Sequence, residues 1–323
     1  MPLFSLDELT AAATLVRTLV PPTAAYAWPL LAEAAGTEII VKHENHTPTG
    51  AFKIRGGLVY VDALCRAGGK PSGFVTATRG NHGQSVALAA SRRGIPSVIV
   101  IPQGNSPEKN AAMEAFGARL ITAGKDFDES RAIAMGMAKD GYHFFPSFHR
   151  ELVRGVATYA LELFTSCADL DAIYVPIGMG SGICATITVR DLLGLKTEIV
   201  GVVAENAPAY ALSFAAGRPV PTNSASTFAD GMACRDPDAD AFAIIKEGAA
   251  RIVSVSEDEI AEAIRLYHTA THNLAEGAGA APLAALLKEK SRYAGKRVAL
   301  ILTGGNIDRP VLAQILGGGT PAP

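Results

Sequence analysis

The residue of this sequence best suited to covalent chemistry is Lys53. It follows a Thr-Pro-Thr-Gly turn at positions 47–50 and stands between Phe52 and Ile54, at the predicted start of a helix. The positive end of a helix dipole favours the neutral form of a lysine amine, and a neutral amine is a nucleophile that forms Schiff bases. Taken alone, the pattern also fits an ordinary surface lysine.

A second segment, 76–85, has the composition of an anion site. It reads Thr-Ala-Thr-Arg-Gly-Asn-His-Gly-Gln-Ser and lies between a predicted strand and a predicted helix. Small and polar residues at such a junction present backbone N–H groups to a carboxylate or phosphate. Asn81 can donate and accept hydrogen bonds, and Arg79 carries a guanidinium fork that suits a carboxylate. A helix cap followed by a surface arginine explains the segment equally well.

Two further segments follow apolar strands. Residues 175–184 read Val-Pro-Ile-Gly-Met-Gly-Ser-Gly-Ile-Cys and lead into a predicted helix. Three alternating glycines at a helix N-terminus predict a phosphate site. The loop does not match the dinucleotide-binding pattern, because Ile183 occupies the place of the third glycine. In the second segment, Thr303 adds a hydroxyl at the end of strand 298–302, before a glycine turn.

The elements that must position these residues alternate along the chain. Apolar runs predict strands at 38–44, 73–78, 97–102, 119–123, 143–146, 172–176, 198–204, 251–255 and 298–302. Amphipathic segments predict helices that include 84–93, 108–116, 128–140 and 257–272. We predict an ordered loop at 218–237 and a frayed tail at 317–323. Continuous apolar strands are typical of parallel sheets covered on both faces, so the fold class is α/β, doubly wound. Ligands bind such sheets beyond the carboxyl ends of the strands.

Composition excludes several classes of function. A net charge of −2 and a pI near 6.4 give no electrostatic basis for binding nucleic acid or an anionic membrane. Four widely spaced cysteines form no C-x-x-C pair, so neither a zinc site nor a redox dithiol is indicated. The first ten residues do not resemble a signal peptide, and no apolar stretch is long enough to span a bilayer. We therefore expect a cytoplasmic protein.

Taken together, the four segments resemble the fold-type II enzymes that depend on pyridoxal 5′-phosphate (PLP), especially the serine/threonine dehydratase and serine racemase family. The likeness covers nearly the whole chain and rests on blocks 50–56 (GAFKIRG), 80–84 (GNHGQ), 178–182 (GMGSG) and 303–306 (TGGN). It implies a large PLP-binding domain of residues 1–70 and 148–323, a small domain of residues 71–147, and the cofactor between them. It also implies a homodimer.

The resemblance implies a role for each site residue. Lys53 would form the Schiff base with the cofactor, Asn81 would bond its ring hydroxyl, and Thr303 would face its ring nitrogen. The other cofactor-binding residues would be Phe52 and, around the phosphate, Gly178, Met179, Gly180, Ser181 and Gly182. The substrate would be bound by Thr78, Arg79, Gly80, Asn81 and His82. Motifs 228–231 and 276–279 are expected near the cofactor.

The neutral hydroxyl of Thr303 indicates the type of reaction. Without a carboxylate partner the ring nitrogen stays unprotonated, and the ring is then a weak electron sink. A weak sink suits β-elimination, in which the leaving group takes up the electrons. We therefore predict a dehydratase (ammonia-lyase) that removes water and ammonia from a β-hydroxy amino acid of the L-threonine/L-serine class, with Lys53 as general base.

Two positions depart from the family pattern. Relatives usually have two serines where this chain has Thr78 and Arg79, and arginine is a poor proton donor, so racemisation is not expected. Arg79 could instead pair with a substrate carboxylate or narrow the pocket, which leaves 3-hydroxyaspartate and phenylserine as alternative substrates. In metal-dependent relatives, the acidic residue that corresponds to Glu205 is followed shortly by a second acidic residue. Residues 206–212 contain none, so no metal is predicted.

Three other functions remain as alternatives. A PLP enzyme that adds a nucleophile, of the cysteine-synthase type, would use the same residues. An NAD-linked oxidoreductase would use the glycine loop with Glu205, but it leaves Lys53 and Asn81 unexplained. A sensor that binds PLP or an amino acid would keep the pocket without turnover.

Overall fold

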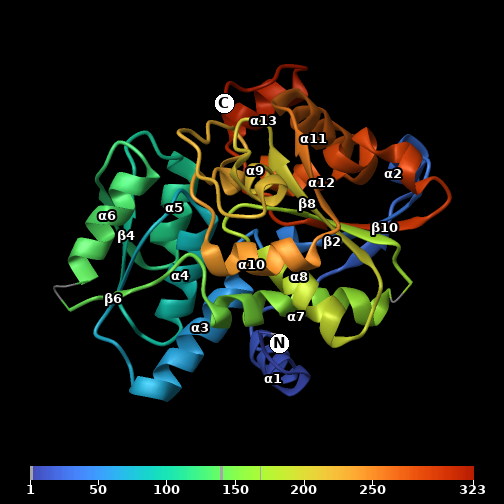
Figure 1. Cartoon of the computed structure of the whole chain (residues 1–323). Coiled ribbons are helices and arrows are strands. Elements are labelled where there is room, and N and C mark those ends of the chain that lie inside the picture. Colours follow the sequence, from blue (N-terminus) through green and yellow to red (C-terminus); the bar gives the residue numbers. More distant parts are fainter. Residues whose placement is uncertain (1–2, 139–140, 168) are drawn as a thin grey trace.

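The computed structural model describes residues 3–138, 141–167 and 169–323. Its strands form two sheets (Figure 1). The larger sheet has the order β1 (Ala25–Ala27), β2 (Glu38–His43), β10 (Arg297–Leu302), β7 (Ala172–Pro176), β8 (Glu198–Ala204) and β9 (Arg251–Val255). The smaller sheet has the order β5 (Ala118–Thr122), β4 (Ser97–Ile101), β3 (Phe74–Ala77) and β6 (His143–Phe144). Every predicted strand is present, with ends within two residues of those predicted.

Helices pack around both sheets. The larger sheet is accompanied by α1 (Leu6–Val16), α2 (Pro29–Ala35), α3 (Lys53–Gly68), α7 (Arg150–Ser166), α8 (Ser181–Leu192), α9 (Ala209–Ala216), α10 (Ala239–Gly248), α11 (Glu257–Thr271), α12 (Gly277–Lys288) and α13 (Arg309–Leu316). The smaller sheet is accompanied by α4 (Asn81–Ser91), α5 (Pro107–Ala115) and α6 (Phe127–Ala138). The short 3₁₀ helices are η1 (Glu44–His46), η2 (Asp230–Met232) and η3 (Lys290–Tyr293). Within the described residues, no helix is long and apolar enough to cross a membrane.

Alternating side chains explain why each sheet is covered on both faces. Along β10, Val298 and Leu300 pack into the core beneath α11 and α12, whereas Ala299 and Ile301 pack into the core beneath α7 and α8. The β4 strand behaves in the same way: its even-numbered valines face α6, and its odd-numbered isoleucines face α4 and α5. Both faces are apolar, as expected for parallel strands buried on two sides.

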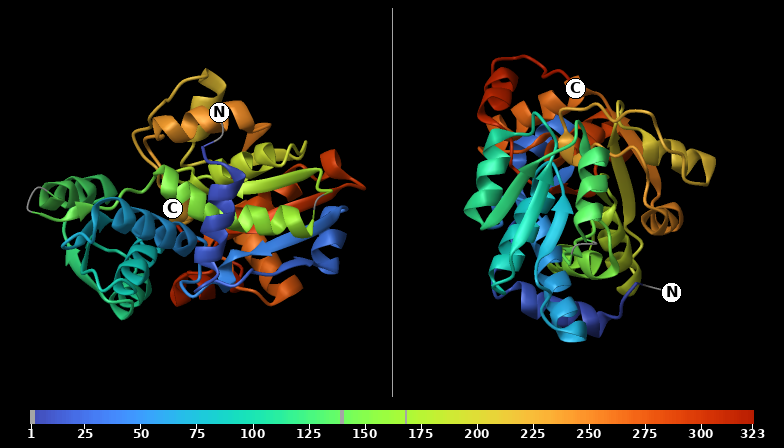
Figure 2. Two further views of the ribbon diagram at one scale, coloured as in Figure 1. Left: turned by 90° about the horizontal axis from the view of Figure 1, so that it is seen from below. Right: turned by 90° about the vertical axis from the view of Figure 1, so that its left-hand side faces the viewer.

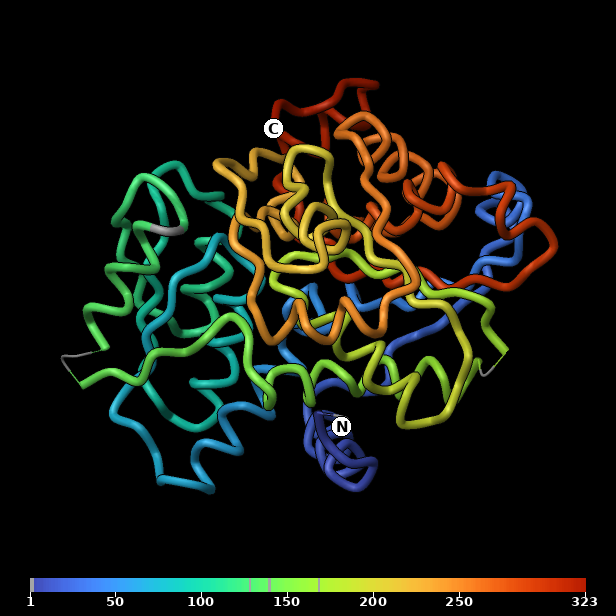
Figure 3. The backbone as a smooth tube through the Cα atoms, viewed as in Figure 1, coloured from blue at the N-terminus to red at the C-terminus, as the bar shows by residue number. Residues whose placement is uncertain are grey.

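The smaller sheet and its helices form a separate lobe, as two other views confirm (Figure 2). The chain enters this lobe after α3 and leaves it after β6, so both crossings are short (Figure 3). All elements of the lobe fall within residues 71–147, the segment predicted as the small domain. The domain boundaries themselves remain a prediction.

Two elements differ from the sequence predictions, and the end of a third lies outside the described residues. The β1 strand was not predicted and pairs with β2 in the antiparallel direction, whereas the other pairings in both sheets are parallel. The α4 helix starts at Asn81 rather than at position 84. The helix predicted at 128–140 is described to Ala138, and its last two positions lie outside the described residues.

The C-terminal tail is ordered, so the prediction of a frayed end at 317–323 is wrong. Arg265 Nη1 donates to the carbonyl oxygens of Ile315 and Gly319, at 3.1 and 3.2 Å. Thr320 Oγ1 donates to Asp258 Oδ1 at 2.5 Å. The bonds of Gly319 and Thr320 attach the tail to α11, although its sequence is rich in glycine and proline.

A buried ionic cluster, made of Thr23, Lys42, Glu44, Arg55 and Glu162, anchors the first turns of α3. The guanidinium of Arg55 is fully buried and donates to the Glu44 carboxylate at 2.7 and 2.9 Å. It also donates to the Glu162 carboxylate at 2.8 and 2.9 Å. Lys42 Nζ donates to Glu162 at 2.6 Å. Because β2, η1 and α7 supply these partners, the cluster holds the start of α3 in one position.

Candidate active site

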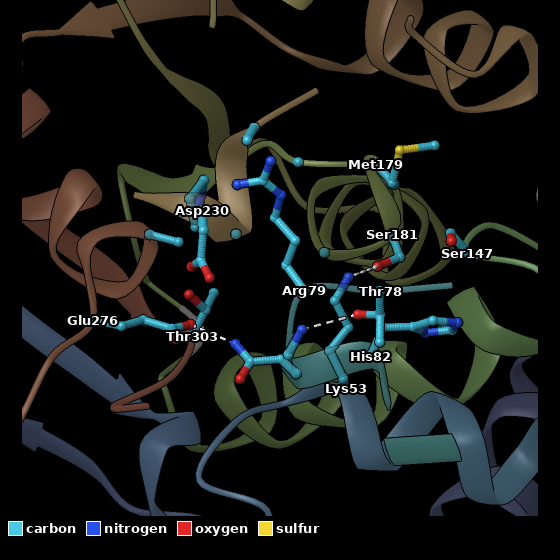
Figure 4. Close-up of a pocket in the computed structure, with 18 of the residues that line it drawn as sticks. Lys53, Thr78, Arg79, His82, Ser147, Met179, Ser181, Asp230, Glu276 and Thr303 are labelled. Carbon is cyan, nitrogen blue, oxygen red and sulfur yellow. Dashed lines mark hydrogen bonds between the residues drawn. The ribbon is translucent and has the colours of Figure 1, made fainter. Parts of the chain in front are cut away.

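A pocket lies where the carboxyl ends of β3, β7 and β10 approach one another, as expected for parallel sheets (Figure 4). It contains about 990 Å³ of empty space, part of it open to solvent. Every residue predicted for the site lines this pocket: Phe52, Lys53, Thr78, Arg79, Gly80, Asn81, His82, Gly178, Met179, Gly180, Ser181, Gly182 and Thr303. The motifs at 228–231 and 276–279 also contribute to its wall. The structure thus brings the four sequence blocks together, and the individual roles remain proposals.

Backbone pairing positions Lys53, the first residue of α3. The N–H of Phe52 donates to the carbonyl oxygen of Thr303 at 3.0 Å, and Ala51 forms a β-bridge with Gly304. Ser85 of α4 donates its hydroxyl to the Lys53 carbonyl at 2.7 Å. The lysine is therefore fixed both to the end of β10 and to the smaller lobe.

The Lys53 amine points at the glycine loop. Its Nζ donates to Ser181 Oγ at 3.3 Å and lies 4.7 Å from the centre of the Phe52 ring. Burial lowers the pKa of Lys53 to about 8, although the nearby Glu276 carboxylate opposes the shift. A lysine with this pKa is substantially neutral slightly above physiological pH, which a nucleophile or a general base requires.

The glycine loop forms a tight cradle at the N-terminus of α8. Gly180 caps this helix with a φ of 92°, a conformation that L side chains rarely adopt. A Cβ at Gly178 would lie only 2.2 Å from the carbonyl oxygen of Gly231, so a side chain there would collide with the neighbouring loop. The first N–H groups of α8 have no partner within the helix, and together with its dipole they favour an anion.

Asn81 is held by two partners on opposite sides. Its Nδ2 donates to Glu276 Oε1 at 2.7 Å, and its Oδ1 accepts from Asn306 Nδ2 at 2.8 Å. Asn306 also donates to the carbonyl oxygen of Thr49 at 2.8 Å. These bonds fix the amide orientation of Asn81 and join α4 of the smaller lobe to the ends of β10 and α12.

A lysine that sequence reasoning missed also lines the pocket. Lys109 of α5 reaches across to η2, where its Nζ donates to Asp230 Oδ2 at 2.5 Å. Gly80 leaves room for this reach, since a Cβ there would lie 2.5 Å from Lys109 Cδ. The two partners are 121 positions apart in the chain. No local pattern around Lys109 indicates the pairing.

The N-terminus of α4 offers fewer free donors than its sequence suggests. The N–H of Thr78 already donates to the Val100 carbonyl at 3.2 Å, and the N–H of Gly80 donates to Thr78 Oγ1 at 3.1 Å. The first-turn N–H groups of Asn81 and His82 have no acceptor within the helix. An anion at this loop would therefore bind to the N–H groups of the first turn of α4.

No metal centre emerges from the described part of the chain, where no three His, Cys, Asp or Glu side chains converge. Glu205, the position compared with a metal ligand, has a different partner. Lys288 Nζ donates to Glu205 Oε1 at 3.3 Å and to Glu259 Oε2 at 3.0 Å. A lysine ammonium therefore supplies the positive charge beside these carboxylates.

A comparison with known protein families shows to which family the chain belongs. The model of the family described as "pyridoxal-phosphate dependent enzyme" matches residues 16–304. The chain belongs to this family. The predictions of fold-type II architecture and of PLP as cofactor are thereby confirmed.

Relatives within the PLP-dependent family share most of the chain. An L-threonine ammonia-lyase of Thermotoga maritima is 34% identical over 319 residues, which cover 98% of this chain and 79% of the relative. An L-threo-3-hydroxyaspartate ammonia-lyase of Saccharomyces cerevisiae is 30% identical, with 91% of this chain and 90% of the relative covered. The solved structure of the processed form of threonine deaminase isoform 2 from Solanum lycopersicum superimposes with a TM-score of 0.89, at 28% identity, and the match covers 98% of this chain and 90% of that one. These relatives support the predicted reaction class.

The residues of the pocket fit PLP. Three of the six buried side-chain polar atoms that have no hydrogen-bond partner in the described residues line this pocket: Thr303 Oγ1, His82 Nε2 and Glu276 Oε2. Buried polar atoms without partners are rare and require an explanation. A cofactor with a phosphate, a ring hydroxyl and a ring nitrogen supplies polar groups to such atoms, and Lys53 supplies the amine.

Proposed function

We propose that this PLP-dependent enzyme is an ammonia-lyase that converts a β-hydroxy amino acid into a 2-oxo acid and ammonia. Its substrate belongs to the class that includes L-threonine, L-serine and 3-hydroxyaspartate. One observation carries the proposal: the Lys53 amine and the unpaired, neutral hydroxyl of Thr303 face the same pocket. The names of the two enzymes similar to this chain support the reaction class.

The cofactor's place follows from the groups around the pocket. When bound, PLP supplies an aldehyde for Schiff-base chemistry and a ring that withdraws electrons from the substrate. Gly178, Gly180 and Ser181 would hold its phosphate at the start of α8. Thr303 Oγ1 would bind its ring nitrogen. Asn81, whose amide is fixed by Glu276 and Asn306, would bind its ring hydroxyl.

Lys53 moves the proton. With the cofactor and substrate bound, its Nζ would take the proton from the substrate Cα as general base. Burial favours this role because it lowers the pKa of Lys53 to about 8. The neutral hydroxyl of Thr303 would leave the ring nitrogen unprotonated, which would favour departure of the β-hydroxyl over a reaction that needs a strong electron sink.

The loop between β3 and α4 holds the substrate carboxylate. The N–H groups of Asn81 and His82 start α4, where the helix dipole favours negative charge. Burial lowers the pKa of His82 to about 3, assisted by the positive charge of Lys53, so its imidazole stays neutral. His82 therefore shapes the loop rather than pairing with the carboxylate as a cation.

Ammonia release from a panel of amino acids tests this proposal. The purified, PLP-loaded protein is assayed with L-serine, L-threonine, 3-hydroxyaspartate and phenylserine, and with sulfide plus L-serine. We expect ammonia and a 2-oxo acid from at least one hydroxy amino acid. Faster consumption of sulfide than release of ammonia would instead indicate a cysteine-synthase type of reaction.

A pair of lysine variants connects the activity to the site. Lys53→Ala should reduce ammonia release to below about a thousandth, because the same amine forms the Schiff base and moves the proton. Lys70→Ala, near the other end of α3 on the exposed surface, is the matched control and should keep the wild-type rate. Substantial turnover by Lys53→Ala would contradict the proposed role.

We further infer a cytoplasmic homodimer. The four cysteines are free thiols, which supports a reducing compartment. The dimer is inferred from the resemblance to the family. Light scattering coupled to size-exclusion chromatography should give about twice the chain mass of 33.6 kDa.

A further inference from the structure

A second cavity adjoins the active-site pocket. It contains about 900 Å³ of empty space, part of it open to solvent. The two hollows share four lining residues, Arg79, Phe127, Met179 and Ala233. The rest of the second wall comes from the start of α6 and from the loop at 223–236. A substrate side chain longer than that of threonine and directed toward the shared residues would reach this second cavity.

Arg79 stands at the junction of the two hollows. It belongs to the loop between β3 and α4 and directly precedes the N–H groups at the start of α4 that receive the α-carboxylate in the proposed function. Its side chain extends past Lys53 toward the side of the pocket where Asp230 and Met179 lie (Figure 4). The residue is exposed, and its guanidinium makes no hydrogen bond or ion pair with the residues that the structure describes.

The other charges that line the active-site pocket are compensated or weakened. Asp230 is bound to Lys109 at 2.5 Å. Burial raises the pKa of Glu276 to about 7, against the pull of Lys109, so this carboxyl is partly protonated near neutral pH. Burial lowers the pKa of Lys53 to about 8, which weakens its positive charge near neutral pH. Arg79 therefore has no ion pair in the described residues, and neither has Arg131 of the second cavity, which the carboxylates of Asp126 and Asp236 also line.

We propose that Arg79 determines substrate specificity by binding a second carboxylate on the substrate side chain. The enzyme would then prefer acidic β-hydroxy amino acids, of which 3-hydroxyaspartate is the shortest. A planar guanidinium binds a carboxylate through two parallel hydrogen bonds, which gives direction as well as charge. This inference rests on the proposed ammonia-lyase function and names the class of substrate within it.

Selectivity measured on two arginine variants tests the inference. The quantity compared is kcat/KM for 3-hydroxyaspartate divided by kcat/KM for L-threonine. Arg79→Met, which removes charge at similar length, should lower this ratio roughly 10- to 100-fold, mainly through the KM for 3-hydroxyaspartate. Arg92→Met, an exposed arginine just after α4, is the matched control and should keep the wild-type ratio.

The salt dependence of KM distinguishes a charged role of Arg79 from a purely steric one, because a steric role would not make KM depend on salt. In the wild type, the KM for 3-hydroxyaspartate should rise with added sodium chloride, because ions screen an exposed pair. The KM for L-threonine should respond less, and Arg79→Met should lose the difference. A ratio that Arg79→Met leaves unchanged, or a wild-type preference for phenylserine over 3-hydroxyaspartate, would overturn the assignment.

Binding of two unreactive amino acids separates this inference from the proposed function. L-aspartate and L-asparagine differ in charge but hardly in shape, and neither carries a β-hydroxyl. Calorimetry on the PLP-loaded protein should show tighter binding of aspartate, by roughly tenfold, and Arg79→Met should abolish the preference. If no hydroxy amino acid releases ammonia, the proposed function fails, and this comparison still decides the role of Arg79. Equal affinities in the wild type would refute that role.

Discussion

Lys53 and Arg55 lie two residues apart on α3, yet their surroundings are of opposite kinds. Arg55 belongs to the buried ionic cluster, in which each charged group has a partner within hydrogen-bonding distance. Lys53 faces a pocket in which Thr303, His82 and Glu276 each have a buried polar atom without a partner among the described residues. The first region is complete without a ligand, and the second is not.

This difference distinguishes buried charges that stabilise the fold from charges that bind a ligand. Desolvation penalises a buried charge wherever it lies, and bonds to fixed partners compensate it in the cluster. In the pocket a bound cofactor or substrate would supply the compensation. Substitutions in the cluster should therefore change mainly stability, whereas substitutions in the pocket should change mainly ligand binding.

The largest effect is expected from breaking the cluster at Arg55. Arg55→Met leaves the Glu44 and Glu162 carboxylates buried without their main partner, and it should destabilise the protein by about 3–5 kcal/mol. Urea denaturation of the cofactor-free protein measures the loss. Because this variant risks not folding, Thr158→Val is tested beside it. That change removes one acceptor of Arg55, 3.1 Å from Nη1, and should cost about 1 kcal/mol. Unchanged stability in both variants would contradict the view that the ionic cluster stabilises the fold.

A smaller effect, of a different kind, is expected at Thr303. Thr303→Val keeps the side-chain shape and removes a hydroxyl that has no partner in the described residues. The cofactor-free protein should be about as stable as the wild type, whereas PLP should be retained roughly tenfold more weakly. Equilibrium dialysis against PLP measures retention, and Thr303→Ser should restore it. A loss of stability without a change in PLP affinity would show that Thr303 stabilises the fold rather than binding the cofactor.

The smallest effect concerns Glu276 and depends on pH. Burial raises the pKa of Glu276 from 4.5 to about 7, so ionising this carboxyl opposes folding above pH 7 and has no effect on stability below about pH 4.5. Glu276→Gln should raise the melting temperature of the cofactor-free protein by a few degrees at pH 8. The gain should shrink as the pH falls through 7 and vanish near pH 4.5. A gain independent of pH would show that Glu276 is not ionised in this range.

Features with a local cause could be predicted from the sequence. Continuous apolar runs predict nine strands, and the glycine loop and Lys53 are recognisable because each follows a strand or turn. The β1 strand was missed because three residues at an antiparallel edge carry no periodic pattern. The start of α4 was placed late because Asn81, His82 and Gly83 are typical of turns as much as of helices.

Features that depend on distant partners could not be predicted. Lys109 and Asp230 meet only after the two lobes have come together, and Asn81 reaches Glu276 across 195 positions. The ordered tail has a similar origin, since Arg265 of α11 supplies its hydrogen bonds. In each case the local sequence favours solvent exposure, and the tertiary fold provides the partner.

The main chain and the side chains at the loop between β3 and α4 have different proposed roles. In the proposed function, the N–H groups of Asn81 and His82 at the end of this loop bind the carboxylate that every amino acid carries, and the side chain of Arg79 is proposed to bind the part in which amino acids differ. A mutation at this position alters the side chain and leaves the peptide groups in place. Substrate range in this enzyme can therefore evolve by single codon changes, with the reactive centre inherited intact.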